Sequence, residues 1–353
     1  MLAVRHVAIL TGGGDCPGLN AVIRAVTLAL LSEGDARITG IERGFHGLLT
    51  RRVRPLLHGD VAGILAEGGT ILGTHNRCDP FRYEGVDRSA EALAYLRELG
   101  VDALVAIGGD GTMHIAERLQ RLGLPVVGVP KTIDNDLPDT DRSFGFDSAV
   151  AVVAEALDRL ATTARSHGRV MVVETMGRDA GWIALEGGLA GGADAILIPE
   201  LPFSLEALVE RARLHERDGG SLLVCVAEGV DLDGSGPVVR EMVADPAAPV
   251  RLGGVSQVLQ SRLQPLLSCE VRSTLLGHVQ RGGTPTAFDR VLATRYGVHA
   301  AELVAAGSFG RMVALQGERV TSVALADVAG RVRQVPPDHE LLRAARGTGV
   351  LLG

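Results

Sequence analysis

The fold of this chain follows from Val7-Ala8-Ile9-Leu10-Thr11-Gly12-Gly13-Gly14-Asp15 and from the helical pattern that runs from Leu19 to Leu31. A run of consecutive aliphatic residues is typical of a strand that is buried on both faces. The glycines allow a tight turn, and the apolar spacing after them predicts a helix. A strand, a glycine turn and a helix form the unit from which parallel α/β sheets are built.

The same order of strand, turn and helix recurs along the chain. Further aliphatic runs that end in glycine- or acid-containing turns occupy residues 103–107, 126–129, 170–173, 195–198 and 222–226. Buried runs that alternate with helices predict mainly parallel sheets with helices on both faces. Such sheets bind ligands at the turns after the carboxyl ends of their strands, so we expect the functional residues there. At 353 residues the chain is long enough for two such domains.

One stretch departs from this pattern. Residues 231–249 are rich in Asp, Gly and Pro, whereas the apolar spacing returns around 255–267. This composition predicts an excursion on the surface, followed by a helix.

Composition and charge exclude several classes of protein. The formal net charge of −7 argues against a nucleic-acid-binding protein. No uninterrupted apolar stretch approaches the ~20 residues that span a membrane, and the N-terminus shows no signal-peptide pattern. The four cysteines have no CxxC spacing. Reduced thiols are typical of the cytosol, so we expect a soluble cytoplasmic protein.

Two glycine turns are candidates for phosphate binding. The turn at residues 11–15 lies between a strand and a helix, where backbone N–H groups and the helix dipole attract an anion. A plain tight turn is the alternative. In Gly108-Gly109-Asp110-Gly111-Thr112 the glycines leave room for a polyphosphate, and Asp110 offers a carboxylate to Mg²⁺. The alternative here is an Asx turn that caps the next helix.

The chain contains one lysine and thirty-four arginines, and Lys131 stands in Pro130-Lys131-Thr132-Ile133-Asp134-Asn135-Asp136. A lysine ammonium is a compact charge that reaches phosphate where space is small. On an extended stretch Asp134 and Asp136 face the same side, one as general base and the other near a metal ion. Thr132 and Lys131 would stabilise a transferring phosphoryl group. A solvated turn, with a lysine kept by chance, is the alternative.

A third cluster of polar residues follows later in the chain. His278-Val279-Gln280-Arg281-Gly282-Gly283 places two donor or cationic side chains three residues apart, before a pair of glycines. With Arg169 and Arg272, His278 and Arg281 would form a pocket for a sugar phosphate. A pair on the open surface is the alternative.

These segments together resemble the phosphofructokinase family, in the order in which that family carries them. The matching stretches are TGGGDCPGLNAVIR, GGTILGTHNR, IGGDGT, PKTIDND, SHGR, ETMGRDAGW, AEG and LGHVQRGGTP, between about Val7 and Arg311. The loop GGDGT also occurs in NAD kinases and lipid kinases, whereas PKTIDND together with MGR and GHVQRGG is specific. The resemblance implies two doubly wound α/β domains with mainly parallel sheets and an active site in the cleft between them.

The resemblance also implies an activity, the Mg²⁺-dependent transfer of a phosphoryl group to the carbon-1 hydroxyl of fructose 6-phosphate in glycolysis. Asp134 matches the general base, and Thr132 and Arg178 match groups that stabilise the phosphoryl group. Asp110 matches the magnesium ligand, with Asp136 nearby. The residues that match the donor site are Gly13, Arg77, Cys78, Gly109, Asp110, Gly111, Thr112 and Lys131. Those that match the sugar-phosphate site are Thr132, Asp134, Arg169, Met176, Gly177, Arg178, Glu228, Arg272, His278 and Arg281.

The resemblance further divides the chain and implies an assembly. Residues 1–145 with 280–330 would form the domain that binds the phosphoryl donor, and residues 146–279 with 331–353 the domain that binds the sugar phosphate. In this family the arginines that match Arg169 and Arg272 enter the pocket from a neighbouring subunit. We therefore expect a homo-oligomer, either a dimer or a tetramer.

Gly111 and Lys131 indicate different phosphoryl donors. In this family glycine at the position of Gly111 accompanies ATP, and aspartate there accompanies pyrophosphate, because a carboxylate would repel the α-phosphate of ATP. Lysine at the position of Lys131 accompanies pyrophosphate, and many ATP enzymes carry glycine there. A lysine is compatible with ATP, whereas a misplaced carboxylate excludes it, so the sequence favours ATP over pyrophosphate.

Other functions fit the sequence less well. The arginine and histidine set indicates a phosphorylated sugar without naming it, so a kinase for tagatose 6-phosphate or a nucleoside-like acceptor is one alternative. A sensor without catalysis would have lost its base, yet Asp134, Asp110, Thr132 and Arg178 are all present. A Rossmann dehydrogenase is disfavoured because the first strand is not followed by GxGxxG.

Overall fold

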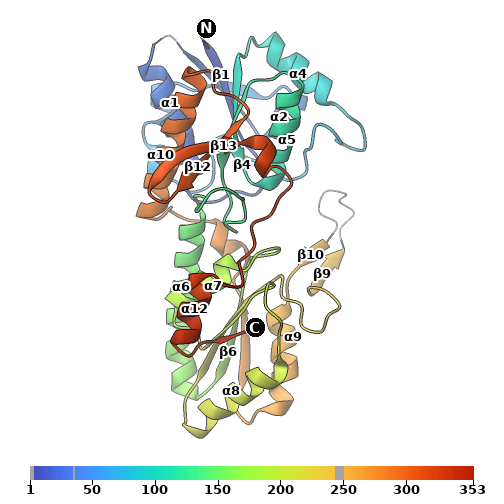
Figure 1. Cartoon of the computed structure of the whole chain (residues 1–353), viewed down its shortest axis with the longest axis vertical. Helices are drawn as coiled ribbons and strands as arrows, with labels where there is room; N and C mark the ends of the chain where they lie inside the picture. Colours follow the sequence, from blue (N-terminus) through green and yellow to red (C-terminus); the bar gives the residue numbers. More distant parts are fainter. Residues whose placement is uncertain (1–3, 35, 243–249) are drawn as a thin grey trace. The chain divides into compact units, whose positions relative to one another are not determined.

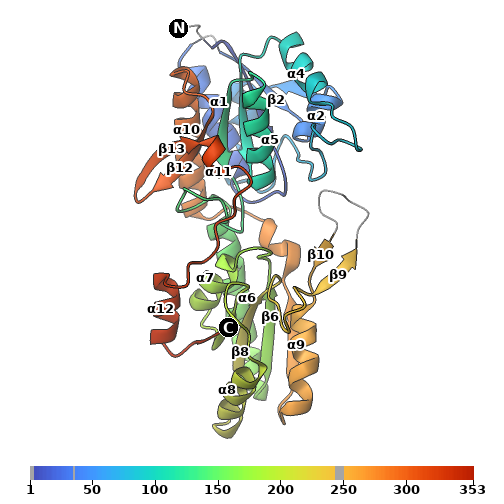
Figure 2. The same cartoon turned by 45° about the vertical axis from the view of Figure 1, so that its right-hand side comes forward.

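A computed structural model describes residues 4–34, 36–242 and 250–353. The chain forms two compact units, which Figures 1 and 2 show in two views. The first unit comprises Met1–Ile133, Leu137–Ser148 and Arg281–Val332, and the second comprises Asp134–Asp136, Ala149–Gln280 and Arg333–Gly353. Each unit contains its own sheet.

The sheet of the first unit has seven strands in the order β13-β12-β5-β4-β1-β2-β3. The strands are β1 (His6–Thr11), β2 (Arg37–Ile41), β3 (Val53–Pro55), β4 (Ala103–Gly108), β5 (Val126–Pro130), β12 (Arg311–Gln316) and β13 (Arg319–Ala324). The five inner strands run parallel, and β3 and β13 are antiparallel edges. Every residue of β1, β4 and β5 is buried, which is why these strands appear in the sequence as unbroken aliphatic runs.

Helices cover both faces of this sheet. They are α1 (Leu19–Ser32), α2 (Phe45–Leu49), α3 (His58–Val61), α4 (Ser89–Glu98), α5 (Asp110–Arg121), α10 (Ala287–Ala305) and α11 (Leu325–Val328), with a 3₁₀ turn, η1 (Ile64–Ala66). Figure 1 shows α1 beside α10 on one face and α4 with α5 on the other. The α1–α10 contact requires Gly297, because a Cβ there would lie 2.6 Å from the Cβ of Ala25.

The second unit has a five-stranded sheet in the order β11-β6-β8-β7-β14, with every pair parallel. Its strands are β6 (Val170–Thr175), β7 (Ala195–Leu197), β8 (Leu222–Ala227), β11 (Val271–Leu275) and β14 (Leu351–Leu352). Its helices are α6 (Phe146–His167), α7 (Trp182–Ala190), α8 (Leu205–Arg217), α9 (Val255–Leu263) and α12 (Glu340–Gly347), with 3₁₀ turns η2 (Gln264–Leu266) and η3 (Gly277–Arg281). The helix expected around 255–267 ends at Leu263, and Pro265 stands in the 3₁₀ turn that follows.

The excursion predicted at 231–249 includes part of a small hairpin. Strands β9 (Val239–Met242) and β10 (Val250–Leu252) pair antiparallel, and residues 243–249 lie outside the described part of the chain. Two α/β units with mainly parallel sheets confirm the predicted fold class. Within the described ranges no helix combines the length and apolar character that a membrane span requires.

One buried acid joins α10 to the start of α6. The side chain of Asp289 is fully buried, and its Oδ2 accepts hydrogen bonds from the backbone N–H of Ser148 at 2.8 Å and from the Ser148 hydroxyl at 2.7 Å. Burial raises the pKa of Asp289 from 3.8 to about 6, because a carboxylate loses its hydration there. The folded protein therefore keeps a proton on Asp289 at a pH where the unfolded chain has released it.

This shift predicts a pH dependence of stability. The contribution of Asp289 to the free energy of unfolding is largest below pH 3.8 and decreases as the pH rises to about 6, by ~3 kcal/mol at most. Asp289→Asn stays neutral, so its unfolding free energy, measured in urea between pH 4 and 6, should decrease less with pH than that of the parent protein. Asp158→Asn, which changes an exposed acid of α6, should keep the parental slope. Equal slopes for all three proteins would contradict the assignment.

Candidate active site

The two glycine turns lie side by side because β1 and β4 are neighbours in the sheet. Thr11 pairs with Ile107, and the N–H of Gly12 donates to the Ile107 carbonyl at 2.8 Å. Thr112 packs against both turns: a Cβ on Gly12 would lie 2.5 Å from the Thr112 Oγ1, and a Cβ on Gly108 would lie 2.2 Å from it. Both glycines are therefore required for the two turns to meet.

Lys131 lies against the same two turns. It is 3 % exposed, its backbone N–H donates to the Gly108 carbonyl at 2.9 Å, and its ammonium donates to the carbonyl of Gly14. A Cβ on Gly13 would lie 3.5 Å from the lysine Nζ. Gly13, Thr112 and Lys131 thus lie close together within the first unit. An ammonium beside a glycine turn is the arrangement that suits a phosphate.

Asp110 and Gly111 begin helix α5, where the helix dipole is positive. The Asp110 Oδ1 accepts a hydrogen bond from the N–H of Gly330 at 2.9 Å, which orients the carboxylate. A Cβ on Gly111 would meet no heavy atom of the described residues within 4 Å, and this residue has no positive φ. Packing therefore requires glycine at 108 but not at 111.

The donor set fits Mg²⁺ better than a metal with a closed protein cage. Among the residues that the structure describes, no three His, Cys, Asp or Glu side chains gather in a group able to hold a metal. Mg²⁺ commonly binds one or two protein carboxylates and fills its shell with phosphate oxygens and water. Asp110, at a helix N-terminus beside the two glycine turns, is a carboxylate of this kind.

Arg77 and Cys78 belong to a segment that is fixed to the first glycine turn. The Thr74 hydroxyl donates to the Gly13 carbonyl at 2.5 Å, and the Thr11 hydroxyl donates to the Gly73 carbonyl at 2.8 Å. Burial raises the pKa of Cys78 to about 12, so its thiol stays protonated. The hydrogen bonds of Thr74 and Thr11 place the exposed Arg77 on a segment beside the glycine turn.

The geometry around Asp134 and Asp136 differs from the expectation. Asn135, between them, has a φ of +52°, in the left-handed region, so the stretch is not extended and the argument from alternating faces is wrong. The strand pairing ends with the bridge between Lys131 and Phe144. The Ser143 hydroxyl donates to the Thr132 carbonyl at 2.7 Å, and the Asp136 carbonyl accepts from the N–H of Arg333 at 2.7 Å. The two acids therefore lie on a turn that is held by its neighbours.

In the second unit the turns after β6 and β8 are joined. The N–H of Gly229 donates to the Gly177 carbonyl at 3.1 Å, and the N–H of Glu228 donates to the Thr175 carbonyl at 3.0 Å. A Cβ on Gly229 would lie 2.0 Å from the Arg178 carbonyl, so this contact requires glycine. The structure thus places Met176, Gly177, Arg178 and Glu228 at the same edge of this sheet.

The turn that contains His278 is attached to the same edge of this sheet. Gln280, fully buried in η3, accepts a hydrogen bond at its Oε1 from the N–H of Met176 at 3.3 Å.

Arg281 belongs to the first unit, where its guanidinium donates to the Asp15 carbonyl at 3.2 Å. A Cβ on Gly14 would lie 2.8 Å from this guanidinium.

Arg169 and Arg272 lie at the opposite end of the sheet. Arg169 precedes the first residue of β6, Arg272 pairs with Met171 in the neighbouring strand, and both form ion pairs with Glu270. Strand β6 has six residues, and at ~3.3 Å per residue its ends are ~20 Å apart. Within one chain these arginines therefore do not reach the residues that follow β6.

Two acids with a structural role near the site were missed in the sequence. The buried Glu174 accepts hydrogen bonds from the N–H groups of Gly254 and Ser256 and from the Ser256 hydroxyl, which caps helix α9. Glu200 accepts from the N–H groups of Gly181 and Val335, both at 2.9 Å. Their positions at or just after strand ends are a signal, but their partners are distant in the sequence.

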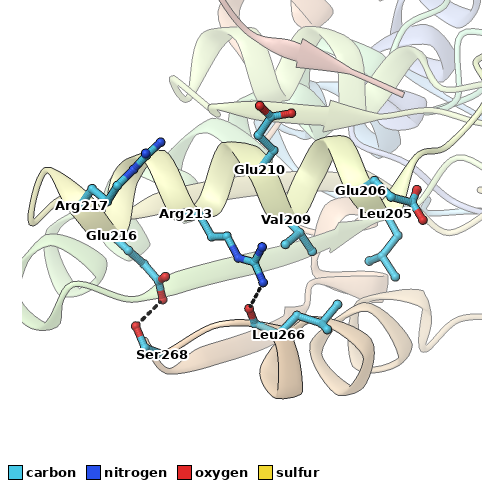
Figure 3. Close-up of a pocket in the computed structure, with 9 residues that line it drawn as sticks. All are labelled: Leu205, Glu206, Val209, Glu210, Arg213, Glu216, Arg217, Leu266 and Ser268. Atoms are coloured by element: carbon cyan, nitrogen blue, oxygen red, sulfur yellow. Dashed lines mark hydrogen bonds between the residues drawn. The ribbon is translucent and has the colours of Figure 1, made fainter.

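A separate groove of about 800 Å³ lies on the second unit between α8 and η2. Figure 3 shows its lining, in which Arg213 donates to the Leu266 carbonyl and the Ser268 hydroxyl donates to Glu216. Its apolar residues are Leu205, Val209 and Leu266. None of the predicted site residues lines this groove, so it is not part of the candidate active site.

Comparison with known proteins identifies relatives along nearly the whole chain. A family model described as "Phosphofructokinase" matches residues 6–304. The chain is 51 % identical to pyrophosphate–fructose 6-phosphate 1-phosphotransferase of Amycolatopsis methanolica, over 95 % of this chain and 97 % of that one. It is 48 % identical to ATP-dependent 6-phosphofructokinase of Chloroflexus aurantiacus, over 99 % of this chain and 98 % of that one.

Solved structures give the same result. Phosphofructokinase of Pichia pastoris in the T-state aligns with a TM-score of 0.81 and 33 % identity over 93 % of this chain. This chain spans 36 % of that larger one. The pyrophosphate-dependent phosphofructokinase of Marinobacter aquaeolei aligns with a TM-score of 0.82 at 22 % identity, which supports the fold. The resemblance deduced from the sequence motifs is confirmed.

The glycine geometry predicts different costs for two substitutions that are close in the sequence. Gly108→Ala would force a Cβ into the Thr112 side chain and should lower the free energy of unfolding by about 1–3 kcal/mol. Gly111→Ala projects into open space at the start of a helix and should change it by less than about 0.5 kcal/mol. Urea unfolding of both variants provides the measurement. Equal losses would contradict the packing account.

Proposed function

Because the chain belongs to the phosphofructokinase family, we propose that it transfers the terminal phosphoryl group of ATP to the carbon-1 hydroxyl of fructose 6-phosphate. The product is fructose 1,6-bisphosphate, and the step belongs to glycolysis. The observation that carries the proposal is the meeting of both glycine turns with Lys131 and the helix N-terminus at Asp110. Together they supply the backbone donors, the charge and the carboxylate that a nucleotide polyphosphate with its metal requires.

The choice of ATP rests on Gly111. The glycine at 108 is explained by packing, but packing does not require a glycine at 111, so its missing side chain leaves space beside the donor turns. The ammonium of Lys131 bonds to the Gly14 carbonyl, so this lysine also has a structural role that does not depend on the donor. Relatives of both kinds have similar identities, 51 % for a pyrophosphate enzyme and 48 % for an ATP enzyme, so overall identity does not decide the donor.

We assign the chemical roles as follows. The carboxylate of Asp134 takes the proton of the attacking hydroxyl, and Thr132, Lys131 and Arg178 stabilise the charge on the phosphoryl group. Asp136 supports this turn through its backbone contact with Arg333. Asp110 would hold Mg²⁺, which when bound neutralises the charge on the donor phosphates.

The sugar phosphate would bind at the carboxyl edge of the second sheet, beside Met176, Gly177, Arg178 and Glu228. We also assign His278 and Arg281 to the sugar-phosphate site. The donor site includes Arg77 and Cys78. The amino-edge position of Arg169 and Arg272, ~20 Å away, supports their delivery to another subunit's pocket in a homo-oligomer. We place the enzyme in the cytoplasm, since its four cysteines are unpaired thiols.

The first test measures fructose 1,6-bisphosphate formation from fructose 6-phosphate and Mg²⁺, with ATP and pyrophosphate supplied separately. Turnover with ATP is the expected result. Turnover with pyrophosphate alone would assign the donor to the Lys131 signature instead. Activity with neither donor would overturn the proposed reaction and direct the assay to other sugar phosphates.

A negative charge at position 111 should impair the use of ATP. Gly111→Asp should lower kcat/KM for ATP by roughly 100-fold or more, because a carboxylate in the open space repels the nucleotide phosphates. Gly111→Asn has nearly the same shape without the charge, and its loss should be much smaller. Steady-state kinetics of both variants with each donor are the measurement. Equal losses with ATP would show that charge is not the cause.

The assignment of the base predicts a loss of turnover without a loss of binding. Asp134→Ala should lower kcat by roughly 100- to 10,000-fold, the usual contribution of a general base. Calorimetry should still detect fructose 6-phosphate binding by the variant. Asp158→Ala, at an exposed position of α6, serves as the matched control. A kcat for Asp134→Ala near that of the control would contradict the assignment of Asp134 as the general base.

A further inference from the structure

The segment Gly330–Val335, which we name the strap, leads from α11 to α12 and makes contacts within each of the two units. In the first unit the N–H of Gly330 donates to the Asp110 carboxylate at 2.9 Å. In the second unit the N–H of Arg333 donates to the Asp136 carbonyl at 2.7 Å. One short stretch of backbone therefore holds the residue assigned to the metal and the turn that carries the assigned base.

The strap is itself fixed at its second half. The indole N–H of Trp182 donates to the Arg333 carbonyl at 3.0 Å, and the Gln334 amide donates to the Asp179 carbonyl at 3.2 Å. The N–H of Val335 donates to the Glu200 carboxylate at 2.9 Å, and the same carboxylate accepts from Gly181. Of these partners, Asp179, Gly181 and Trp182 lie just before α7 or at its start. Glu200 follows β7. The strap is thus joined to the turn that follows Arg178.

Arg333 is the best fixed residue of the strap. Its N–H bonds to Asp136, its carbonyl accepts from Trp182, and its guanidinium carbon lies 4.5 Å from the centre of the Trp182 ring. With both backbone groups and the side chain engaged, its position relative to Asp136 is set by the second unit.

The turn that Arg333 contacts needs such support. Asn135 adopts a left-handed φ of +52°, a sparsely populated region that Asn enters more readily than most residues other than glycine because its side chain can hydrogen-bond locally. Strained backbone persists when its surroundings hold it, and such strain is concentrated at functional sites. Asn135 is 3 % exposed, so the turn is enclosed as well as held.

We propose that the strap positions the catalytic turn at residues 134–136 and the Asp110 carboxylate, with the backbone N–H of Arg333 as the positioning group. The proposal rests on the proposed function only for the chemical role of Asp134. Arg333 does not act on the substrate: it acts through the Asp136 carbonyl. Loss of this N–H should leave the fold intact and allow the turn to move.

A pair of variants at one position separates the N–H from the side chain. Arg333→Ala removes the guanidinium and keeps the backbone N–H. Arg333→Pro removes the guanidinium and the N–H. Each variant keeps the backbone carbonyl that accepts the hydrogen bond from Trp182. Trp182 is the only tryptophan of the chain, so its fluorescence emission reports whether the strap remains attached. Relative to Arg333→Ala, we expect Arg333→Pro to lower kcat at least tenfold with unchanged tryptophan emission.

Hydrogen exchange gives a readout that does not depend on activity. Amides in the peptide that covers residues 131–136 should exchange at least tenfold faster in Arg333→Pro than in Arg333→Ala. Trp182→Phe replaces the indole with a smaller aromatic ring and removes the hydrogen bond to the Arg333 carbonyl, so it should also accelerate exchange of the 131–136 peptide. This variant keeps the test decisive where proline itself distorts the strap.

The two proposals fail in different ways. Equal exchange of the 131–136 peptide in the proline and alanine variants, with no change in Trp182→Phe, would overturn the positioning role. An unmodified protein that forms no fructose 1,6-bisphosphate with either donor would overturn the proposed reaction, and the exchange comparison would still decide the role of the strap.

Discussion

The structure of the donor side depends on the close approach of two turns that follow neighbouring parallel strands. Thr112 fits against bare backbone at Gly12 and Gly108, where a Cβ would overlap its side chain. This contact sets the distance between the first glycine turn and the N-terminus of α5. Lys131, which donates to the carbonyl of Gly14 across 117 residues of sequence, ties the end of β5 to the same point. The groups that we assign to the donor site are therefore placed by strand order and by the absence of side chains.

The second unit separates its charged residues by the polarity of its sheet. All of its strand pairs are parallel, so every carboxyl end lies at one edge and every amino end at the other. Arg178 and Glu228 follow carboxyl ends, whereas Arg169 and Arg272 lie at the amino edge and share Glu270. A parallel sheet thus gives one chain two separate basic edges. A site that needs residues from both edges requires a second copy of the chain.

Buried and half-buried acids stabilise helix ends and loops without taking part in the chemistry that we assign. Glu174 binds the N-terminus of α9, where the unsatisfied N–H groups and the dipole favour a carboxylate. Glu200 joins the start of α7 to the strap, and Asp289 joins α10 to Ser148. Each of these carboxylates satisfies backbone donors at the end of a helix or loop. Of these acids, Glu174 lies in the strand that leads to Met176, and Glu200 binds the N–H of Gly181 shortly after Arg178, so these two hold segments beside candidate site residues.

The sequence by itself determined the buried strands, the turns that carry the site and the family, because each of these is written in contiguous residues. The run at 7–10 is aliphatic because both faces of its strand are covered, and the PKTIDND and MGR segments are local patterns. Only the tertiary structure decided the left-handed turn at Asn135, the structural role of Lys131, the amino-edge position of Arg169 and the path of the strap. The physical reason is that these features depend on contacts between distant residues, such as Gly330 with Asp110 across 220 positions, for which no local propensity gives a signal.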